Sequence, residues 1–259
     1  MKLQDRMHHW FLAELFSTAR GRAYVLSQAA QAESGGEQKI FDVLLEHVDD
    51  PELARMVKKH REDEVRHADL YSECAARQGA KLPPIPDELK IIDTVDRYIG
   101  EARGGVRFFD ETVHDDRYVM EGYLFLQVLE ERAVQKFRVL ADALRPFDAR
   151  SAAIILEIEA DERRHLRYCY AISKRYAATP EALETTLAKF RRAEALAYRD
   201  HTQHSLDFLL REGFIPSKTK ALFWRGISSA TAFTELPWTD LGRPSRHTQR
   251  TDAAHLQAA

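Results

Sequence analysis

The sequence predicts an all-α fold: a four-helix bundle with a long crossover between its second and third helices, followed by a C-terminal helical appendage. Glycine and proline occupy only 11 and 9 of 259 positions, which disfavours a turn-rich β fold. Apolar residues recur at helical spacing, and no long segment alternates as a strand does. The helical segments form two pairs joined by one long connection, a pattern typical of such bundles.

The bounds of these elements follow from apolar periodicity and from glycine and proline breaks. In order, we expect helical structure over 9–48 with interruptions at Gly21 and Gly35–Gly36, a turn at 49–51, a helix to about Arg77, a connection over 79–113 with an amphipathic piece, helices over 116–144, 149–177 and 182–211, and irregular structure from Gly213. The residues divide into a bundle at 1–178, an extension packed on it at 179–242 and a flexible tail at 243–259.

Composition limits the function. Lys plus Arg is 38 and Asp plus Glu is 41, so a net charge of −3 gives no global sign of nucleic-acid binding. Cys74 and Cys169 are too few for a disulfide framework, so we expect a cytoplasmic protein with reduced thiols. The longest apolar run, 152–156, is too short to span a bilayer, and the N-terminus lacks signal-peptide features.

The two helix pairs carry the same motif. Residues 63–67 and 161–165 both read D-E-x-R-H, which places Glu64 beside His67 and Glu162 beside His165 on one helix face. Both faces are otherwise largely apolar, and a buried carboxylate is costly unless it is paired or binds a metal. Solvated surface pairs are the alternative, but two copies of the motif favour a metal site.

Further carboxylates are expected one antiparallel helix upstream. Glu33 precedes Glu64 by 31 residues, and Glu130 precedes Glu162 by 32 residues. Glu37 is the alternative to Glu33, although it also fits a capping box with Ser34. Glu131 is the alternative to Glu130, on a more polar face. Four carboxylates and two imidazoles without a thiolate suit two iron or manganese ions better than structural zinc or an iron–sulfur cluster.

This order of residues resembles the ferritin-like di-iron carboxylate superfamily over about residues 10–178. Residues 51–68 are similar to rubrerythrins and to the tRNA-isopentenyladenosine hydroxylase family, and D-E-x-R-H resembles hydroxylase subunits of bacterial multicomponent monooxygenases. A rubredoxin-type Cys-x-x-Cys module is missing, which excludes a complete rubrerythrin.

The resemblance implies a role for each motif residue. Glu64 and Glu162 would bridge two metal ions, Glu33 with His67 would complete one ion, and Glu130 with His165 the other. The remaining charged residues of the motifs would hold the ligands from outside, or else lie on the surface: Asp63, Arg66, Asp161 and Arg164.

Three more residues are candidates near the site. His60 is an extra ligand, a proton donor or a hydrogen-bonded histidine near the pocket mouth. Tyr71 and Tyr123 are proton donors or oxidisable groups, or plain packing residues.

The leading functional expectation is a di-iron oxidoreductase that activates O₂, as a hydroxylase of a small or nucleotide-borne substrate with an external electron donor. A rubrerythrin-like peroxidase or iron-handling protein is the second expectation, and a helical scaffold with a structural or lost metal site is the third. We also expect a homodimer and no membrane partner. Basic clusters could contact tRNA, or be ordinary solvated faces: Arg55, Lys58, Lys59; Lys189, Arg191, Arg192; Lys218, Lys220, Arg225.

Overall fold

Helices account for the regular structure of this computed structural model, which describes residues 3–48, 50–215 and 217–235. The α-helices are α1 Leu3–Phe16, α2 Ala19–Gln31, α3 Gln38–His47, α4 Pro51–Ala76, α5 Ile91–Ala102, α6 Asp116–Leu144, α7 Ala149–Tyr176, α8 Pro180–Arg211 and α9 Lys218–Glu235. A π-helix, η1 Ala32–Glu37, joins α2 to α3, and short 3₁₀ turns lie at Asp87–Leu89 and Phe108–Asp110. Within the described ranges no strand occurs, and no helix is long and apolar enough to cross a membrane. The prediction of an all-α protein is therefore confirmed.

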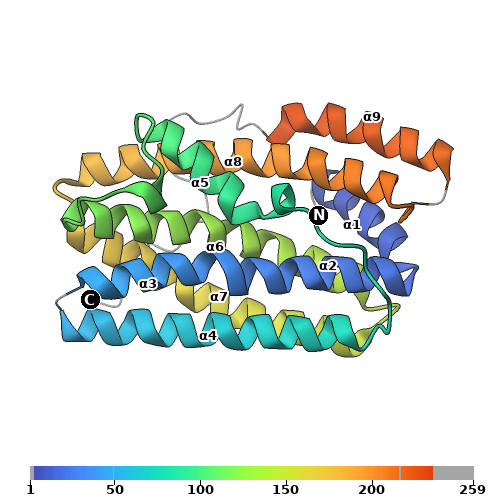
Figure 1. Cartoon of the computed structure of the whole chain (residues 1–259), viewed down its shortest axis with the longest axis horizontal. Helices are drawn as coiled ribbons and strands as arrows, with labels where there is room; N and C mark the ends of the chain where they lie inside the picture. Colours follow the sequence, from blue (N-terminus) through green and yellow to red (C-terminus); the bar gives the residue numbers. More distant parts are fainter. Residues whose placement is uncertain (1–2, 49, 216, 236–259) are drawn as a thin grey trace.

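Four long rods run side by side through the molecule. The first rod consists of α2, η1 and α3 and lies along α4, while α6 lies along α7 (Figure 1). Contacts between α3 and α6 and between α4 and α7 join the two pairs. The crossover between α4 and α6 carries α5, which packs on α8, and α8 and α9 form the outer layer on the side away from α4 (Figure 1).

Side-chain caps fix where most of these helices begin. A serine, threonine, aspartate or asparagine at the N-cap, the residue just before the helix, accepts hydrogen bonds from otherwise unpaired N–H groups of the first turn. Such a cap stabilises the helix by about 1 kcal/mol. The cap residues that accept from the first turn are Thr18 for α2, Asp50 for α4, Asp115 for α6, Asp148 for α7 and Thr179 for α8. Pro51 and Pro180 occupy the first helical position, where a missing N–H is harmless.

Two apolar clusters fill the space between the rods, one toward each end. The first includes Phe41 on α3 and Phe125 on α6, and the second includes Leu26 on α2 and Leu144 on α6. On each rod the residues of the D-E-x-R-H motifs and their upstream glutamates fall between the positions that build these two clusters. The candidate site therefore lies at mid-length, with packed apolar layers above and below it.

The structure corrects two expectations about element bounds. The first rod begins a new helix after Thr18 rather than breaking at Gly21, which sits in the first turn of α2. A Cβ at Gly21 would lie 2.0 Å from the carbonyl oxygen of Leu15, so the close approach of α1 to α2 requires glycine here. The prediction of irregular structure from Gly213 is wrong for Lys218–Glu235, which is α9.

Aromatic packing explains α9 better than local propensity does. Trp224 contacts the rings of Trp10 and Phe11, with centroids 5.4 and 5.0 Å away. These contacts bury one side of a segment that contains a glycine and several weak helix formers, so tertiary packing outweighs propensity. Residues 236–259, which include the predicted tail, lie outside the described residues.

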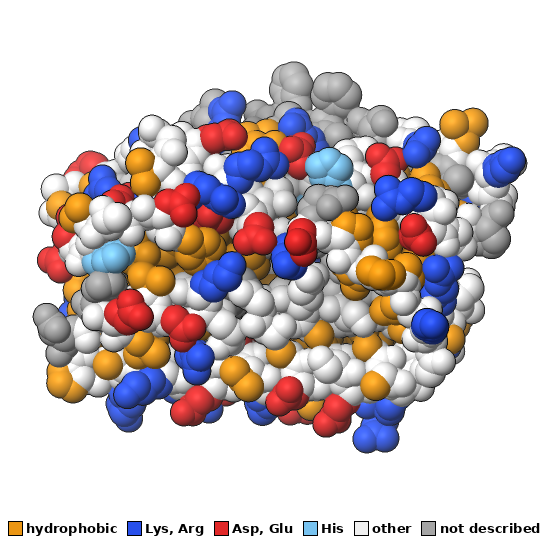
Figure 2. All heavy atoms as spheres, in the orientation of Figure 1, with side chains coloured by type: hydrophobic (Ala, Val, Ile, Leu, Met, Phe, Trp, Pro, Cys, Tyr) orange, Lys and Arg blue, Asp and Glu red, His pale blue; other side chains and the backbone are white. Residues whose placement is uncertain are grey.

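Basic and acidic side chains alternate on the face of the molecule shown in Figure 2. Members of the three basic clusters pair with acidic neighbours: Lys59 with Asp63, Arg191 with Glu131, Lys220 with Glu14 and Arg225 with Asp207. These pairs weaken the case for a phosphate-facing surface.

Candidate metal centre

Six side chains from the four rods meet at mid-length. Each is at most 9% exposed, so none points at bulk solvent. They are Glu33 in η1, Glu64 and His67 on α4, Glu130 on α6, and Glu162 and His165 on α7. The structure therefore brings together all six residues that the sequence singled out as ligands.

Glu64 and Glu162 each reach both histidines. Glu64 places Oε2 3.1 Å from Nδ1 of His67 and Oε1 2.9 Å from Nδ1 of His165. Glu162 places Oε1 2.9 Å from Nδ1 of His67 and Oε2 3.0 Å from Nδ1 of His165. Each carboxylate thus spans the space between the two imidazoles, which is the arrangement that a bridging carboxylate needs.

One oxygen of each bridging candidate lacks a hydrogen bond. A histidine Nδ1 carries at most one hydrogen, and His67 uses it toward Glu64 Oε2 while His165 uses it toward Glu162 Oε2. Glu64 Oε1 and Glu162 Oε1 remain buried without a hydrogen-bond partner. Unpaired buried carboxylate oxygens are costly, and a cation between the histidines would satisfy both.

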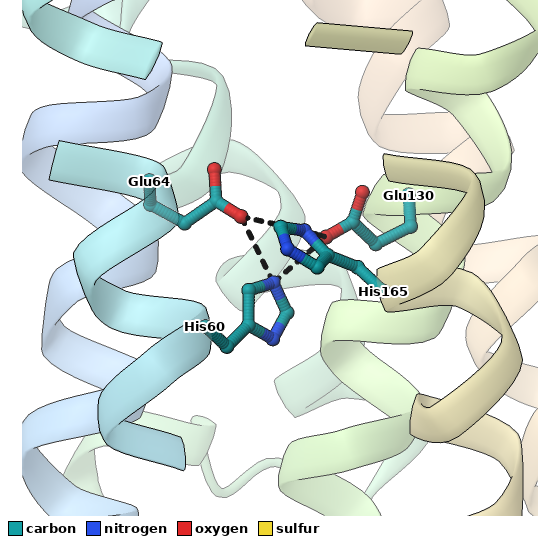
Figure 3. A group of neighbouring side chains, drawn as sticks. All are labelled: His60, Glu64, Glu130 and His165. Carbon is teal, nitrogen blue, oxygen red and sulfur yellow. Dashed lines mark hydrogen bonds and ion pairs between the residues drawn. The ribbon is translucent and has the colours of Figure 1, made fainter. Parts of the chain in front are cut away.

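Ligand atoms form two overlapping groups, each small enough for one ion. Glu33, Glu64, His67 and Glu162 offer atoms that all lie within 4.8 Å of one another. His60, Glu64, Glu130 and His165 form the second group on the same criterion, and Figure 3 shows these four side chains converging. Four carboxylates also balance the charge of two divalent cations, so the donor set fits a pair of such ions.

A local distortion of the first rod carries Glu33. The first rod passes through a π-helix at Ala32–Glu37, and Glu33 lies in its first turn. Single π-turns inside α-helices are frequent at functional sites because they shift the direction of nearby side chains. The side chain of Glu37, the alternative ligand, lies outside the described residues.

Glu131 is held away from the cluster. Its carboxylate pairs with Arg191 on α8, with Oε1 2.5 Å and Oε2 2.9 Å from the guanidinium, and it also accepts a bond from Gln127. Its neighbour Glu130, 3% exposed, is the glutamate that faces the histidines. The structure therefore places Glu130, and not Glu131, among the candidate ligands.

The aspartate of each motif contacts the histidine of the other motif. His165 Nε2 lies 3.3 Å from Oδ2 of Asp63, and His67 Nε2 lies 3.4 Å from Oδ2 of Asp161. Arg164 bonds to both aspartates, at 2.9 Å to Asp63 and 2.6 Å to Asp161. Each aspartate thus supports the histidine of the other motif, and a carboxylate on the outer nitrogen turns the inner nitrogen toward the centre. Arg66 also pairs with Asp161.

Strong electrostatic coupling keeps the cluster ionised. Burial alone would lower the pKa of His67 and His165, but bonds to Glu162 and Glu64 outweigh it and raise the pKa of each to about 10. Burial would raise the pKa of Glu64, yet the close imidazoles of His165, His60 and His67 hold that pKa well below the usual range. The pKa of Glu162 is also lowered, because hydrogen bonds outweigh burial and the repulsion from Glu64. Ionised carboxylates are the form that binds a metal.

His60 lies inside the cluster rather than near a pocket mouth. Its side chain is fully buried, with Nε2 3.1 Å from Glu130 Oε1 and 2.9 Å from Glu64 Oε1. Burial lowers the pKa of His60, so the ring is neutral and able to offer a nitrogen lone pair. Of the interpretations that the sequence left open, an extra ligand or a hydrogen-bonding residue fits this position.

Tyr71 and Tyr168 lie beside the cluster, and Tyr123 is a third buried tyrosine. The hydroxyls of Tyr71, Tyr123 and Tyr168 are buried without a hydrogen-bond partner. Burial raises the pKa of Tyr71, and Glu33 and Glu162 add to the shift, which places Tyr71 beside the first group. Burial raises the pKa of Tyr123 as well, but its charged neighbours are Cys169 and Tyr176 rather than the carboxylates.

Tyr168 is a residue that sequence reasoning missed. Its ring packs edge-on against His60, with centroids 5.2 Å apart, and also contacts His165 at 5.8 Å. Its position three residues after His165 places it on the same helix face, which is a signal that could have identified it. Burial raises its pKa, with contributions from Cys169 and Glu130.

Two cavities of the described structure lie away from the cluster. One of about 260 Å³ lies between α1, α2, α8 and α9, with Tyr24 and Trp224 in its wall. Another of about 230 Å³ lies between the α2–η1 segment and the start of α5. Neither is lined by a candidate ligand, although Ala32 and Gly35, on either side of Glu33, line the second.

Comparisons with known proteins add no identity: no family model, no curated protein and no solved structure matches this chain. Cys74 and Cys169, which the sequence predicted to be reduced, are buried free thiols.

Proposed function

We propose that this chain is a ferritin-like di-metal carboxylate protein that binds two iron ions and acts as an O₂-dependent oxidoreductase. One observation carries the proposal. The carboxylates of Glu64 and Glu162 each place one oxygen near His67 and the other near His165, and each has one buried oxygen without a hydrogen bond. Manganese, or one ion of each kind, is compatible with the same oxygen-rich donors.

In this proposal each residue has a stated task. Glu64 and Glu162 would contribute to both metal positions, Glu33 would complete one position with His67, and Glu130 would complete the other with His165. Asp63 and Asp161 hold the outer N–H groups of the histidines and so fix the inner nitrogens as ligands. Bound ferrous ions would supply the electrons and open coordination positions that reduction of dioxygen requires.

The apolar layers around the cluster exclude water from it. Phe41 packs against His60, with ring centroids 4.5 Å apart, and Tyr71 is fully buried beside the first group. A dry site strengthens every electrostatic interaction within it and suppresses unwanted proton transfer. The hydroxyl of Tyr71 is the candidate proton or electron donor of the chain, since its raised pKa keeps it protonated and its hydrogen has no acceptor among the described residues.

Enclosure of the cluster favours a second candidate function. The six candidate ligand side chains are each at most 9% exposed, which favours reactants as small as dioxygen, hydrogen peroxide or ferrous ion. A rubrerythrin-like peroxidase or an iron-handling protein needs nothing larger. A hydroxylase needs a path for its organic substrate, and the cavity beside Ala32 and Gly35 is where such a path would begin.

Anaerobic loading with Fe(II) followed by O₂ tests the proposal. We expect two equivalents of iron per chain, and O₂ consumption that an E64A/E162A variant lacks. Oxygen consumption that stops once the bound iron is oxidised, and resumes only when fresh Fe(II) is added, would favour iron handling. Turnover of hydrogen peroxide with an added reductant would favour a peroxidase. A chain that retains no iron would refute the proposal and leave a helical scaffold.

A further inference from the structure

The two halves of the repeat differ in the buried residue one turn before the bridging glutamate. One turn before Glu64 stands His60, whereas one turn before Glu162 stands Ile158. Both side chains are buried, at 1% and 0% exposure. This difference gives one half of the repeat an inward nitrogen donor that the other half lacks.

His60 joins only one of the two groups of ligand atoms. In that group His60 and His165 supply nitrogen and Glu64 and Glu130 supply oxygen (Figure 3). The other group contains a single histidine, His67, beside three glutamates. One position is therefore nitrogen-rich and the other is oxygen-rich.

Close packing fixes the ring of His60 in the nitrogen-rich group. Its centroid lies 3.8 Å from that of His165, 4.5 Å from that of Phe41 and 5.2 Å from that of Tyr168. Its Nδ1 is buried without a hydrogen-bond partner, so these ring contacts take the place of the aspartates that hold the other two histidines. The ring presents Nε2 to Glu64 and Glu130.

We propose that the two metal positions are chemically unequal, and that His60 makes the nitrogen-rich position selective for later, more nitrogen-preferring divalent ions such as Co(II) or Fe(II) over Mn(II). The oxygen-rich position with Glu33 then accepts Mn(II) nearly as well as the other position does. This inference rests on the proposed function, because it requires both positions to bind metal.

Ligand chemistry supports this difference. Imidazole nitrogen suits iron, cobalt, nickel and zinc, whereas carboxylate oxygen suits manganese and magnesium. The affinity of a given site also rises from Mn(II) through Fe(II) to Co(II). Repulsion between two bound dications and the shared carboxylates of Glu64 and Glu162 affect all divalent ions alike. A difference between cobalt and manganese in the ratio of the two binding constants therefore reports the nitrogen donor.

Titration of the metal-free full-length chain with Co(II) and, separately, with Mn(II) tests the inference. Calorimetry and cobalt visible absorption give the two binding constants, and electron paramagnetic resonance counts free Mn(II). We expect the ratio of the two constants to be about tenfold or more larger for Co(II) than for Mn(II), in line with the effect of one good ligand. One equivalent of each ion should then give a mixed pair.

Variants at position 60 separate ligation from hydrogen bonding. H60I copies the other half of the repeat and should still bind two ions, with the cobalt ratio falling to the manganese ratio. H60Q retains a hydrogen-bond donor and should behave as H60I does. I158V, which changes the equivalent position in the other half, is the matched control and should retain the wild-type ratios.

Two outcomes would overturn the inference. The first is a ratio of the two binding constants in the wild-type chain that is the same for Co(II) and for Mn(II). This result does not depend on the folding of any variant. The other is a wild-type cobalt ratio in H60Q, which would show that His60 only donates a hydrogen bond. Binding of two ions with equal ratios rejects this inference alone, whereas binding of fewer than two ions by the wild-type chain rejects the proposed function.

Discussion

Removing the charge of Asp63 should weaken the metal position that contains His165, not the one formed by its own motif neighbour His67. In the structure Asp63 Oδ2 lies 3.3 Å from Nε2 of His165. An Asp63→Asn change keeps the size of the side chain and removes the carboxylate that polarises the imidazole. Because each aspartate contacts the histidine of the other motif, the structure predicts which of the two metal-binding constants changes.

The magnitude follows from the contacts of Asp63. Loss of an outer partner of a ligating histidine lowers metal affinity about 10- to 100-fold, or roughly 1.4–2.7 kcal/mol. Asp63 also pairs with Lys59 and Arg164, whose side chains are 65% and 46% exposed, so these pairs contribute little. We therefore expect a change in metal binding of this size and a smaller change in stability.

Two-site titration with Co(II), monitored by calorimetry and visible absorption, measures the effect. Asp69→Asn is the control, because Asp69 lies on the same helix but is exposed. Asp161→Asn should weaken the other position, the one that contains His67. If Asp63→Asn and Asp69→Asn behaved alike, or if Asp63→Asn weakened the same constant as Asp161→Asn, the crossed arrangement would be refuted.

Three further predictions concern ligand choice, packing and pH. Glu130→Gln should reduce bound metal from two ions to one by metal analysis, while Glu131→Gln keeps two; equal stoichiometry would contradict the assignment. Gly21→Ala places a Cβ 2.0 Å from a carbonyl oxygen and should destabilise the chain by about 1–3 kcal/mol in urea unfolding, whereas Gly226→Ala, with open space, should not. Burial and nearby His204 lower the pKa of His201 to about 4, so the unfolded chain binds this proton more tightly than the folded chain does. The free energy of unfolding should therefore fall as pH drops below about 6.5, by up to about 1.4 kcal/mol per pH unit. This fall should be shallower in His201→Gln, and parallel curves of stability against pH for the two proteins would refute the prediction.

Much of the centre could be predicted from the sequence because hairpin geometry constrains it. Two antiparallel helices joined by a short turn bring residues about 30 apart to the same level, which identified Glu33 and Glu130 from Glu64 and Glu162. Helical periodicity then showed that the motif residues face inward. The preference for Glu130 over Glu131 followed from the polarity of each helix face, and Arg191 explains it physically.

Other features depend on contacts between elements that a single helix does not determine. Each aspartate supports the histidine of the other motif, and this depends on how α4 packs against α7. The π-helix that carries Glu33 includes two adjacent glycines, which the sequence indicated only as an interruption. The helix α9 depends on the aromatic contacts of Trp224 with α1, which join the two ends of the chain.

The crossed arrangement implies that neither half of the repeat can form a metal position alone. Each histidine has inner carboxylates from both motifs and an outer aspartate from the other motif, so α4 must pack on α7 before either position is complete. Without metal, that packing holds buried carboxylate oxygens that lack hydrogen bonds, which opposes folding. Metal binding removes this penalty, so metal affinity and the free energy of unfolding are linked. A change that loosens the contact between α4 and α7 should therefore lower both the metal affinity and the free energy of unfolding of the metal-bound protein. The metal-free protein, which already carries the unpaired oxygens, should lose less stability from the same change.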